Sequence, residues 1–226
     1  MREVKGEAMS RYLELLEKHF VAKEKDAGKF KDFKIGPMRN KARHFEVEGF
    51  GHVSIMESTA LFGLMKMEAF NMVPTQVDLP LFSIDTITVM GNKTAIVELY
   101  EIFLRKENFQ EDALLRIKEE CSSLPDYKTE DRWYTPLKME SSWAKKVKKP
   151  DWSKVDKAIS DMLEAFLSLG EKTPRLVNGE VIIKSELEST FASRLVEEGG
   201  VSTDMFVKKI GEKETLNFFH SVFYGV

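Results

Sequence analysis

Hydrophobic residues follow two different periods along this chain of 226 residues, and the changes of period divide it into three parts. From about residue 5 to residue 27, apolar residues recur at three-, four- and seven-residue offsets, which predicts an amphipathic helix. Residues 42–104 instead carry short runs rich in β-branched and aromatic side chains, which predict strands. After residue 105 the pattern returns mainly to helical spacing.

The middle part is expected to be a β-meander, because its strands are joined by connections too short for a crossover. Gly91-Asn92 is a tight hairpin signal between two of these strands. The central strand shows no clean alternation of apolar and polar residues, so both faces of the sheet are expected to be covered. The strands are predicted at residues 43–50, 52–59, 61–72, 81–90 and 94–104.

The last part is expected to supply most of the helices that cover the sheet. Capping residues and glycines mark several helix ends, for example Gly170 and Gly211. The predicted fold class is α/β, a three-layer α/β/α sandwich with a central antiparallel sheet flanked by helices on both faces, formed by residues 1–226 as a single domain. The helices are predicted at residues 109–124, 151–169, 181–198, 205–210 and 212–224, with an irregular strand and loop at 132–143.

The stretch from Asp78 to Val89 is the predicted central strand with its entry turn, and it holds a carboxylate among apolar residues. Pro80 fits a strand entry, where a missing N–H costs least. Asp85 lies in the middle of the strand. A buried and unpaired carboxylate is costly and usually takes up a proton. Asp85 is therefore either hydrogen-bonded for structural reasons or kept as a tunable acid.

Other carboxylates within predicted strands are candidates for acid–base chemistry together with Asp85. Glu57 and Glu68 lie in the second and third strands. Acids that meet across a covered sheet push their pKa values apart, so that a protonated donor can stand beside an ionised partner. Glu98 and Glu101 lie near the end of a strand, and we expect them to be solvated.

Composition and the absence of certain motifs exclude several classes of function. The formal net charge of −3 offers no basic excess for binding nucleic acid. The single cysteine, Cys121, excludes an internal disulfide, and the histidines lack the spacing of metal ligands. The sequence has no glycine-rich phosphate loop, signal peptide or membrane-spanning run, so we expect a cytoplasmic protein without a membrane partner. The basic run at residues 145–149 is either solvated or a docking patch for an acidic protein.

Two segments of the chain resemble the ferredoxin-dependent bilin reductases, in particular the phycocyanobilin:ferredoxin oxidoreductases. The first runs from Glu57 through Val73-Pro74 to Asp78-Leu79-Pro80-Leu81-Phe82-Ser83-Ile84-Asp85, where the family has a strand Glu and then an Asp-Leu-Pro-hydrophobic-Phe-Gly/Ser-x-Asp segment. The second, residues 207–224, resembles the family's short helix, glycine and last helix with an aromatic-rich end. The resemblance covers about residues 40–226, and the related red chlorophyll catabolite reductases share the family's fold.

The resemblance implies that a linear tetrapyrrole lies between the sheet and the C-terminal helices. It also implies that no metal or organic cofactor is used: electrons come singly from reduced ferredoxin, and side chains supply protons to the bilin radical. Asp85 falls on the family's central proton donor, and Glu57 on the acid that phycocyanobilin-forming members use at a vinyl group. Strand parity places Ser83 and Ile87 on the face of Asp85. The other residues expected to bind the substrate are Met67, Ala69 and Asp204.

The sequence also departs from the family pattern. Ala69 stands where family members have His or Asn on the strand after the Glu. The second catalytic Asp of several members has no clean counterpart, and Asp204 lies in the region where it would fall. These departures leave open which double bond is reduced.

The implied function is the ferredoxin-dependent reduction of a linear tetrapyrrole such as biliverdin, with protons from Asp85 and Glu57. This is an oxidoreductase reaction on CH–CH groups, connected with heme degradation. The implied partners are the tetrapyrrole and ferredoxin or a similar acidic electron donor, and the protein is expected to be a monomer that binds neither nucleic acid nor membrane. Three alternatives stay open: a non-catalytic tetrapyrrole-binding protein, a reductase of a chlorophyll catabolite, and an interaction domain without a small-molecule pocket.

Overall fold

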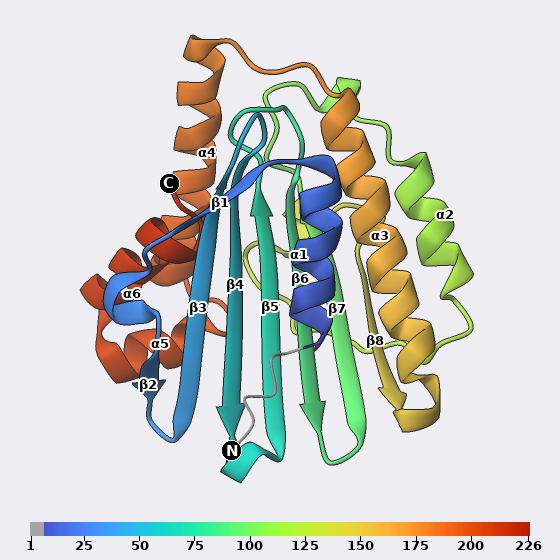
Figure 1. The fold of residues 1–226 in the computed structure, drawn as a ribbon, viewed down its shortest axis with the longest axis vertical. Coiled ribbons are helices and arrows are strands. Elements are labelled where there is room, and N and C mark those ends of the chain that lie inside the picture. The colour runs from blue at the N-terminus through green and yellow to red at the C-terminus, as the bar shows by residue number, and fades with distance from the viewer. Residues whose placement is uncertain (1–6) are drawn as a thin grey trace.

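A computed structural model describes residues 7–226, and an eight-stranded antiparallel sheet forms its centre (Figure 1). Neighbouring strands follow the order β1-β3-β4-β5-β6-β7-β8, and β2 also pairs with β3. Strands β3 to β7 are therefore a meander of consecutive hairpins, as the sequence predicts. The strands are β1 (Ala22–Lys25), β2 (Phe33–Ile35), β3 (Met38–Val47), β4 (Gly51–Ala60), β5 (Met65–Val73), β6 (Leu81–Val89), β7 (Asn92–Tyr100) and β8 (Trp143–Lys148).

Helices cover both faces of this sheet, which confirms the predicted α/β sandwich. Figure 1 shows α1 and α3 in front of the strands with α2 beside α3, while the C-terminal helices lie beside and behind the strands. The helices are α1 (Glu7–His19), α2 (Asp112–Glu120), α3 (Trp152–Lys172), α4 (Asn178–Glu197), α5 (Thr203–Ile210) and α6 (Glu212–Phe218), followed by a π-helical turn at Phe219–Phe223.

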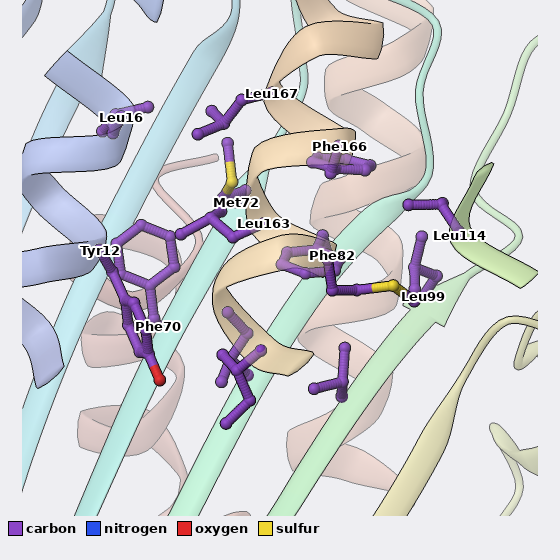
Figure 2. Packing of buried hydrophobic residues seen from close by; sticks show 14 of the residues in the cluster. Tyr12, Leu16, Phe70, Met72, Phe82, Leu99, Leu114, Leu163, Phe166 and Leu167 are labelled. Atoms are coloured by element: carbon purple, nitrogen blue, oxygen red, sulfur yellow. The ribbon is translucent and has the colours of Figure 1, made fainter. Parts of the chain in front are cut away.

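The face of the sheet under α1 and α3 carries a closely packed apolar core (Figure 2). Phe82 of β6 stacks on Phe166 of α3 with ring centroids 4.7 Å apart. Tyr12 of α1 meets Phe70 of β5 edge-on at 5.7 Å. All four side chains are fully buried, and aromatic residues remove the largest apolar area per residue from water. This layer therefore holds β5 and β6 in fixed positions.

The opposite face carries a second apolar cluster, formed with α4, α5, α6 and the π-helical turn. Phe206 and Phe218 stack within it at 5.4 Å. The turn is also held to the sheet by polar contacts, since His52 Nε2 of β4 lies 2.9 Å from the Val222 carbonyl oxygen. Burial of His52 lowers its pKa to about 4, so this ring is neutral at physiological pH.

The first helix ends earlier than the apolar pattern predicts. α1 stops at His19, and residues Ala22–Lys25 form β1, which pairs with β3 at the edge of the sheet. The two ring nitrogens of His19 lie 2.9 and 3.0 Å from carboxylate oxygens of Glu164 and Glu171 on α3. These contacts fix the end of α1 on α3. Residues 5 and 6, the predicted start of the helix, lie outside the described residues.

The basic run at residues 145–149 belongs largely to the sheet, so only part of it can be solvated or serve as a docking patch. β8 pairs with β7, so alternate residues of β8 point inward. Lys145 is 4% exposed, and its Nζ donates to the Leu124 carbonyl at 3.0 Å and to Asp126 at 2.6 Å. A lysine at an inward position hides the two-residue period of this strand in the sequence. The exposed lysines of the run are Lys146, Lys148 and Lys149.

Two predicted helix boundaries also change. Gly170, predicted to end a helix, lies inside α3, where an added Cβ would come within 3.1 Å of Phe20 and 3.3 Å of Phe50. This glycine therefore serves close packing rather than a helix stop. The predicted last helix divides into α6 and the π-helical turn. Among the helices of residues 7–226, none combines the length and apolar character needed to cross a bilayer.

Candidate functional site

A cleft lies between the sheet and the C-terminal helices, on the face opposite the core in Figure 2. About 1030 Å³ of space free of protein atoms lies in the cleft and in the solvent at its opening, and about 150 Å³ can hold the centres of water-sized molecules. Strands β4 to β7 form its floor, and its walls come from the loop at 129–138, the connection from α4 to α5, and the C-terminal turn. The lining mixes apolar side chains such as Met56 and Phe223 with carboxyl, hydroxyl and amide groups. Concave sites of this composition are typical of small-molecule binding.

Strand alternation decides which side chains form the floor of the cleft. Ser83, Asp85 and Ile87 of β6 line it, whereas the adjacent residues Phe82 and Ile84 lie in the apolar core of the other face. The β5 residues paired with these three floor positions also line the cleft, so that four of the predicted substrate-binding residues lie beside Asp85. The paired residues are Asn71 opposite Ser83, Ala69 opposite Asp85 and Met67 opposite Ile87.

Asp85 is partly buried in the cleft floor. Burial disfavours its charged form and, together with the nearby charge of Glu98, raises the pKa of Asp85 to about 7; a hydrogen bond donated by Ser83 to the carboxylate would act in the opposite direction. At neutral pH both the acid and the carboxylate are therefore populated. A group in this state can give up a proton and regain one within a single reaction cycle.

Glu98 is the second carboxyl group of the cleft, on β7 opposite Ser83. Lys138 Nζ lies 2.6 Å from Glu98 Oε1, and the Tyr100 hydroxyl donates to Glu98 Oε2 at 2.5 Å. The side chain of Glu98 is only 14% exposed, so the expectation that it is solvated is wrong. A position near the end of a strand does not imply solvent here, because the loop at 129–138 folds over it.

A chain of hydrogen bonds leads from Asp85 to the C-terminal turn. Ser83 Oγ lies 3.3 Å from Asp85 Oδ2 and 2.8 Å from Asn71 Oδ1. Asn71 Nδ2 donates to Ser54 Oγ at 3.4 Å, and Ser54 Oγ donates to the Phe223 carbonyl oxygen at 2.7 Å. The three connecting side chains are buried. The acid is thus connected through three strands to the segment that closes the cleft.

The structure does not bring Glu57 to this cleft, which corrects the expectation that it shares a site with Asp85. Glu57 pairs with Glu68 of β5, and Glu68 pairs with Thr86 of β6. Their side chains share the face that carries α1 and α3, where Thr86 Oγ1 donates to Glu68 Oε2 at 3.1 Å. A shift of one residue reverses the face of a strand side chain. The cleft position on β4 is therefore the neighbouring Met56, which pairs with Ala69.

Asp204 also lies away from the acid. Its side chain is 51% exposed, forms an ion pair with Arg132 at 3.1 Å and accepts the backbone N–H of Gly200 at 3.2 Å. Of the same segment, Gly200 and Thr203 line the cleft instead. Asp204 therefore shapes the connection from α4 to α5 rather than the cleft floor, which corrects its prediction as a substrate-binding residue.

Several polar residues of the cleft were not identified from the sequence. Asn71 could have been predicted from the sequence, since it lies two residues from Ala69 and therefore shares its strand face. The others come from the end of β7, from the loop at 129–138 and from the C-terminal segment, and no local pattern indicates that they meet at one site. They are Lys138, Tyr100, Tyr134 and Tyr224. Within residues 7–226, no group of three or more His, Cys, Asp or Glu side chains is arranged to hold a metal ion.

Comparisons with known proteins find this fold in phytochromobilin synthase from tomato, whose crystal structure is a complex with biliverdin. The TM-score is 0.76, the sequence identity is 15%, and the match covers 96% of this chain and 82% of that chain. No protein-family model and no curated protein matches the sequence. The two proteins therefore share a fold across almost the whole of this chain, at a sequence identity that leaves the site residues to be judged from their own geometry.

Proposed function

We propose that this protein binds a linear tetrapyrrole such as biliverdin in the cleft and reduces it. The observation that carries the proposal is Asp85, a carboxyl group with a pKa of about 7 in the floor of a cleft. Strongly shifted acids in clefts are typical of sites of proton transfer. The shared fold with a biliverdin-bound phytochromobilin synthase supports the choice of substrate.

The lining of the cleft suits a mainly apolar and partly polar ligand. Met56, Met67 and Ile87 offer apolar surface from three neighbouring strands, and Phe223 offers an aromatic ring from the opposite wall. Asp85 and other polar groups lie among them, where they meet the nitrogen and oxygen atoms of such a ligand. A few polar groups in an apolar lining fix the orientation of a bound molecule.

The reaction that fits these groups adds two electrons and two protons across one double bond. In the proposal the electrons arrive singly, so the pigment passes through a radical that takes a proton from Asp85. Solvent at the open side of the cleft then reprotonates Asp85. Glu98 replaces Glu57 as the second carboxyl group of this scheme, because Glu57 lies on the other face of the sheet.

Reduced ferredoxin or a similar acidic protein is the proposed source of electrons, and the proposal needs no metal or organic cofactor in this chain. Lys146, Lys148 and Lys149 are exposed and offer positive charge to an acidic partner. Lys145 does not belong to that surface, since it is buried and paired with Asp126.

The test is an absorbance titration of the protein with biliverdin, followed by addition of reduced ferredoxin. We expect saturable binding that changes the visible spectrum, and then loss of the biliverdin absorption as a double bond is reduced. The absence of any spectral change on titration would contradict the proposed ligand. A matched sample with ferredoxin but without this protein controls for direct reduction of free pigment.

One observation favours a second function, that of a non-catalytic tetrapyrrole-binding protein. Ala69 pairs directly with Asp85 and offers no polar group beside it. On this alternative the titration shows tight binding, and the pigment stays unchanged after reduced ferredoxin is added. The same experiment therefore separates the two functions.

A further inference from the structure

The direction of the hydrogen bonds beside Asp85 can be deduced from the far end of the chain that they form. The Phe223 carbonyl oxygen can only accept, so the single hydroxyl proton of Ser54 is directed to it. The oxygen of Ser54 is then left to accept, and Asn71 must present its Nδ2 group toward Ser54. The amide oxygen of Asn71 consequently faces Ser83.

The hydroxyl group of Ser83 is oriented in the same way by Asn71. Its only proton goes to Asn71 Oδ1 at 2.8 Å, which is the shorter of its two contacts. The Ser83 oxygen can therefore only accept from Asp85, 3.3 Å away. A carboxylate has no proton to donate, so this last contact is a hydrogen bond only when Asp85 is protonated.

We propose that Asn71 and Ser83 are positioning residues that hold Asp85 as the neutral acid. With Ser54 they form the relay, a chain of hydrogen bonds with one fixed direction between the Phe223 carbonyl and Asp85. Asn71 and Ser54 are each 1% exposed and Ser83 is 8% exposed, so water cannot readily replace a missing partner. The relay deepens the proposed function and rests on it for the role of the proton. Its existence is testable on the protein without pigment.

Other groups also act on Asp85, and none of them belongs to the relay. Glu98 faces it from β7, with Lys138 paired to Glu98 from the covering loop. Tyr134 of that loop and Tyr224 of the C-terminal turn both feel the charge of Asp85. Substitutions within the relay leave these groups in place, so a change in the titration of Asp85 reports on the relay.

Ser83→Ala distinguishes the two possible directions of the last hydrogen bond. If Ser83 accepts from the neutral acid, its removal destabilises that form, and the acid dissociation constant of Asp85 should rise about fivefold, the worth of one ordinary hydrogen bond. If Ser83 instead donates to the carboxylate, the constant should fall. The measurement is the pH dependence of the carboxylic-acid infrared band that Asp85→Asn removes.

Asn71→Ala provides a second variant, which removes the acceptor of the Ser83 proton. Without the amide oxygen, the Ser83 proton is free to turn toward Asp85, which favours the carboxylate, so the dissociation constant should again rise. Asn40→Ala is the matched control. Asn40 accepts from Ser58 at 2.7 Å between β3 and β4, in an equally buried pair that is not connected to the relay. We expect it to leave the titration of Asp85 unchanged.

A fall of the constant in Ser83→Ala would overturn the proposal. The proposal would also be overturned if the acid dissociation constant of Asp85 stayed within twofold of the parent value in both relay variants. A change of that constant in Asn40→Ala as large as in the relay variants would overturn it too. None of these measurements needs biliverdin or ferredoxin. Failure of the relay is therefore distinguishable from failure of the proposed function, which the absorbance titration decides.

Discussion

The two faces of the sheet are built from alternate residues of the same strands, yet they have opposite properties. On β6, Phe82 and Ile84 enter a closely packed core, while Ser83 and Asp85 line an open cleft. The first face is filled by apolar side chains, and the second forms a cleft lined in part by polar side chains. A strand clamped by apolar packing on one side can hold polar groups at fixed positions on the other. The rigid face therefore supports the geometry of the chemical face.

The largest expected effect separates the carboxyl groups of the two faces. Asp85→Asn should bind biliverdin but lose turnover by about 100-fold or more, since general acids contribute at least that factor. Glu57→Gln, on the face of α1 and α3, should change turnover less than about twofold on the same reasoning. Single-turnover absorbance traces with reduced ferredoxin measure both. A loss in Glu57→Gln as large as in Asp85→Asn would show that the assignment of faces does not control the chemistry.

The next effect separates the two faces by stability. Phe82→Ala removes a ring from the core against Phe166 and should lower the free energy of unfolding by about 3–5 kcal/mol. Ile87→Ala, in the floor of the cleft, should cost about 1 kcal/mol or less because the side chain is already partly exposed. Urea unfolding followed by circular dichroism provides both values. Equal losses would mean that the cleft face is packed as tightly as the core.

A third prediction concerns how the stability of the protein depends on pH. The pKa of Asp85 rises from 3.8 to about 7 on folding, so the folded state keeps a proton that the unfolded state releases between these values. This contribution to stability is complete below pH 3.8 and disappears as pH rises through 7. Its full size is at most about 4 kcal/mol, and we expect about 2 kcal/mol because water enters the cleft.

The control for this pH dependence is Asp85→Asn, which cannot titrate at that position. Unfolding free energies of parent and variant are compared from acid to neutral pH. The unfolding free energy of the parent minus that of the variant should fall as pH rises, since only the parent loses stability from this group. A constant difference would show that Asp85 has an ordinary pKa in the folded protein.

The smallest effect tests the coupling between the two carboxyl groups of the cleft. Glu98→Gln removes a negative charge near Asp85, so the pKa of Asp85 should fall and the alkaline limit of turnover should move down by about 1 pH unit. A pH profile of turnover measures the change. Glu68→Gln is the matched substitution on the other face, and it should leave the profile in place.

The fold was largely predictable because the relevant signals are local. Hairpin turns and helix periods identified the meander from β3 to β7 and the covering helices. The failures have physical reasons. β8 was missed because Lys145 occupies an inward position and is satisfied by Leu124 and Asp126, contacts that no local pattern reveals. β1 was read as part of a helix because its pairing with β3 depends on a distant segment.

The predicted residues that line the cleft lie on two neighbouring strands, β5 and β6. Parity alone placed Ser83 and Ile87 beside Asp85. Glu57 failed because its position relative to Asp85 depends on the register of two hairpins, and an error of one residue exchanges the faces. Glu98 was misjudged because its burial comes from Lys138 and its loop, which are separated from it by about forty residues of chain.

The floor of the cleft and the wall opposite it come from separate stretches of sequence, and this separation matters for how such a protein diversifies. The floor with its acid is contained in residues 56–100, whereas α4, α5 and the C-terminal turn supply the opposite wall from residues 195–224. Mutations in the second stretch can reshape the space above Asp85 without altering the strand that carries it. Descendants of one ancestor can therefore acquire new ligand preferences while they inherit the same acid.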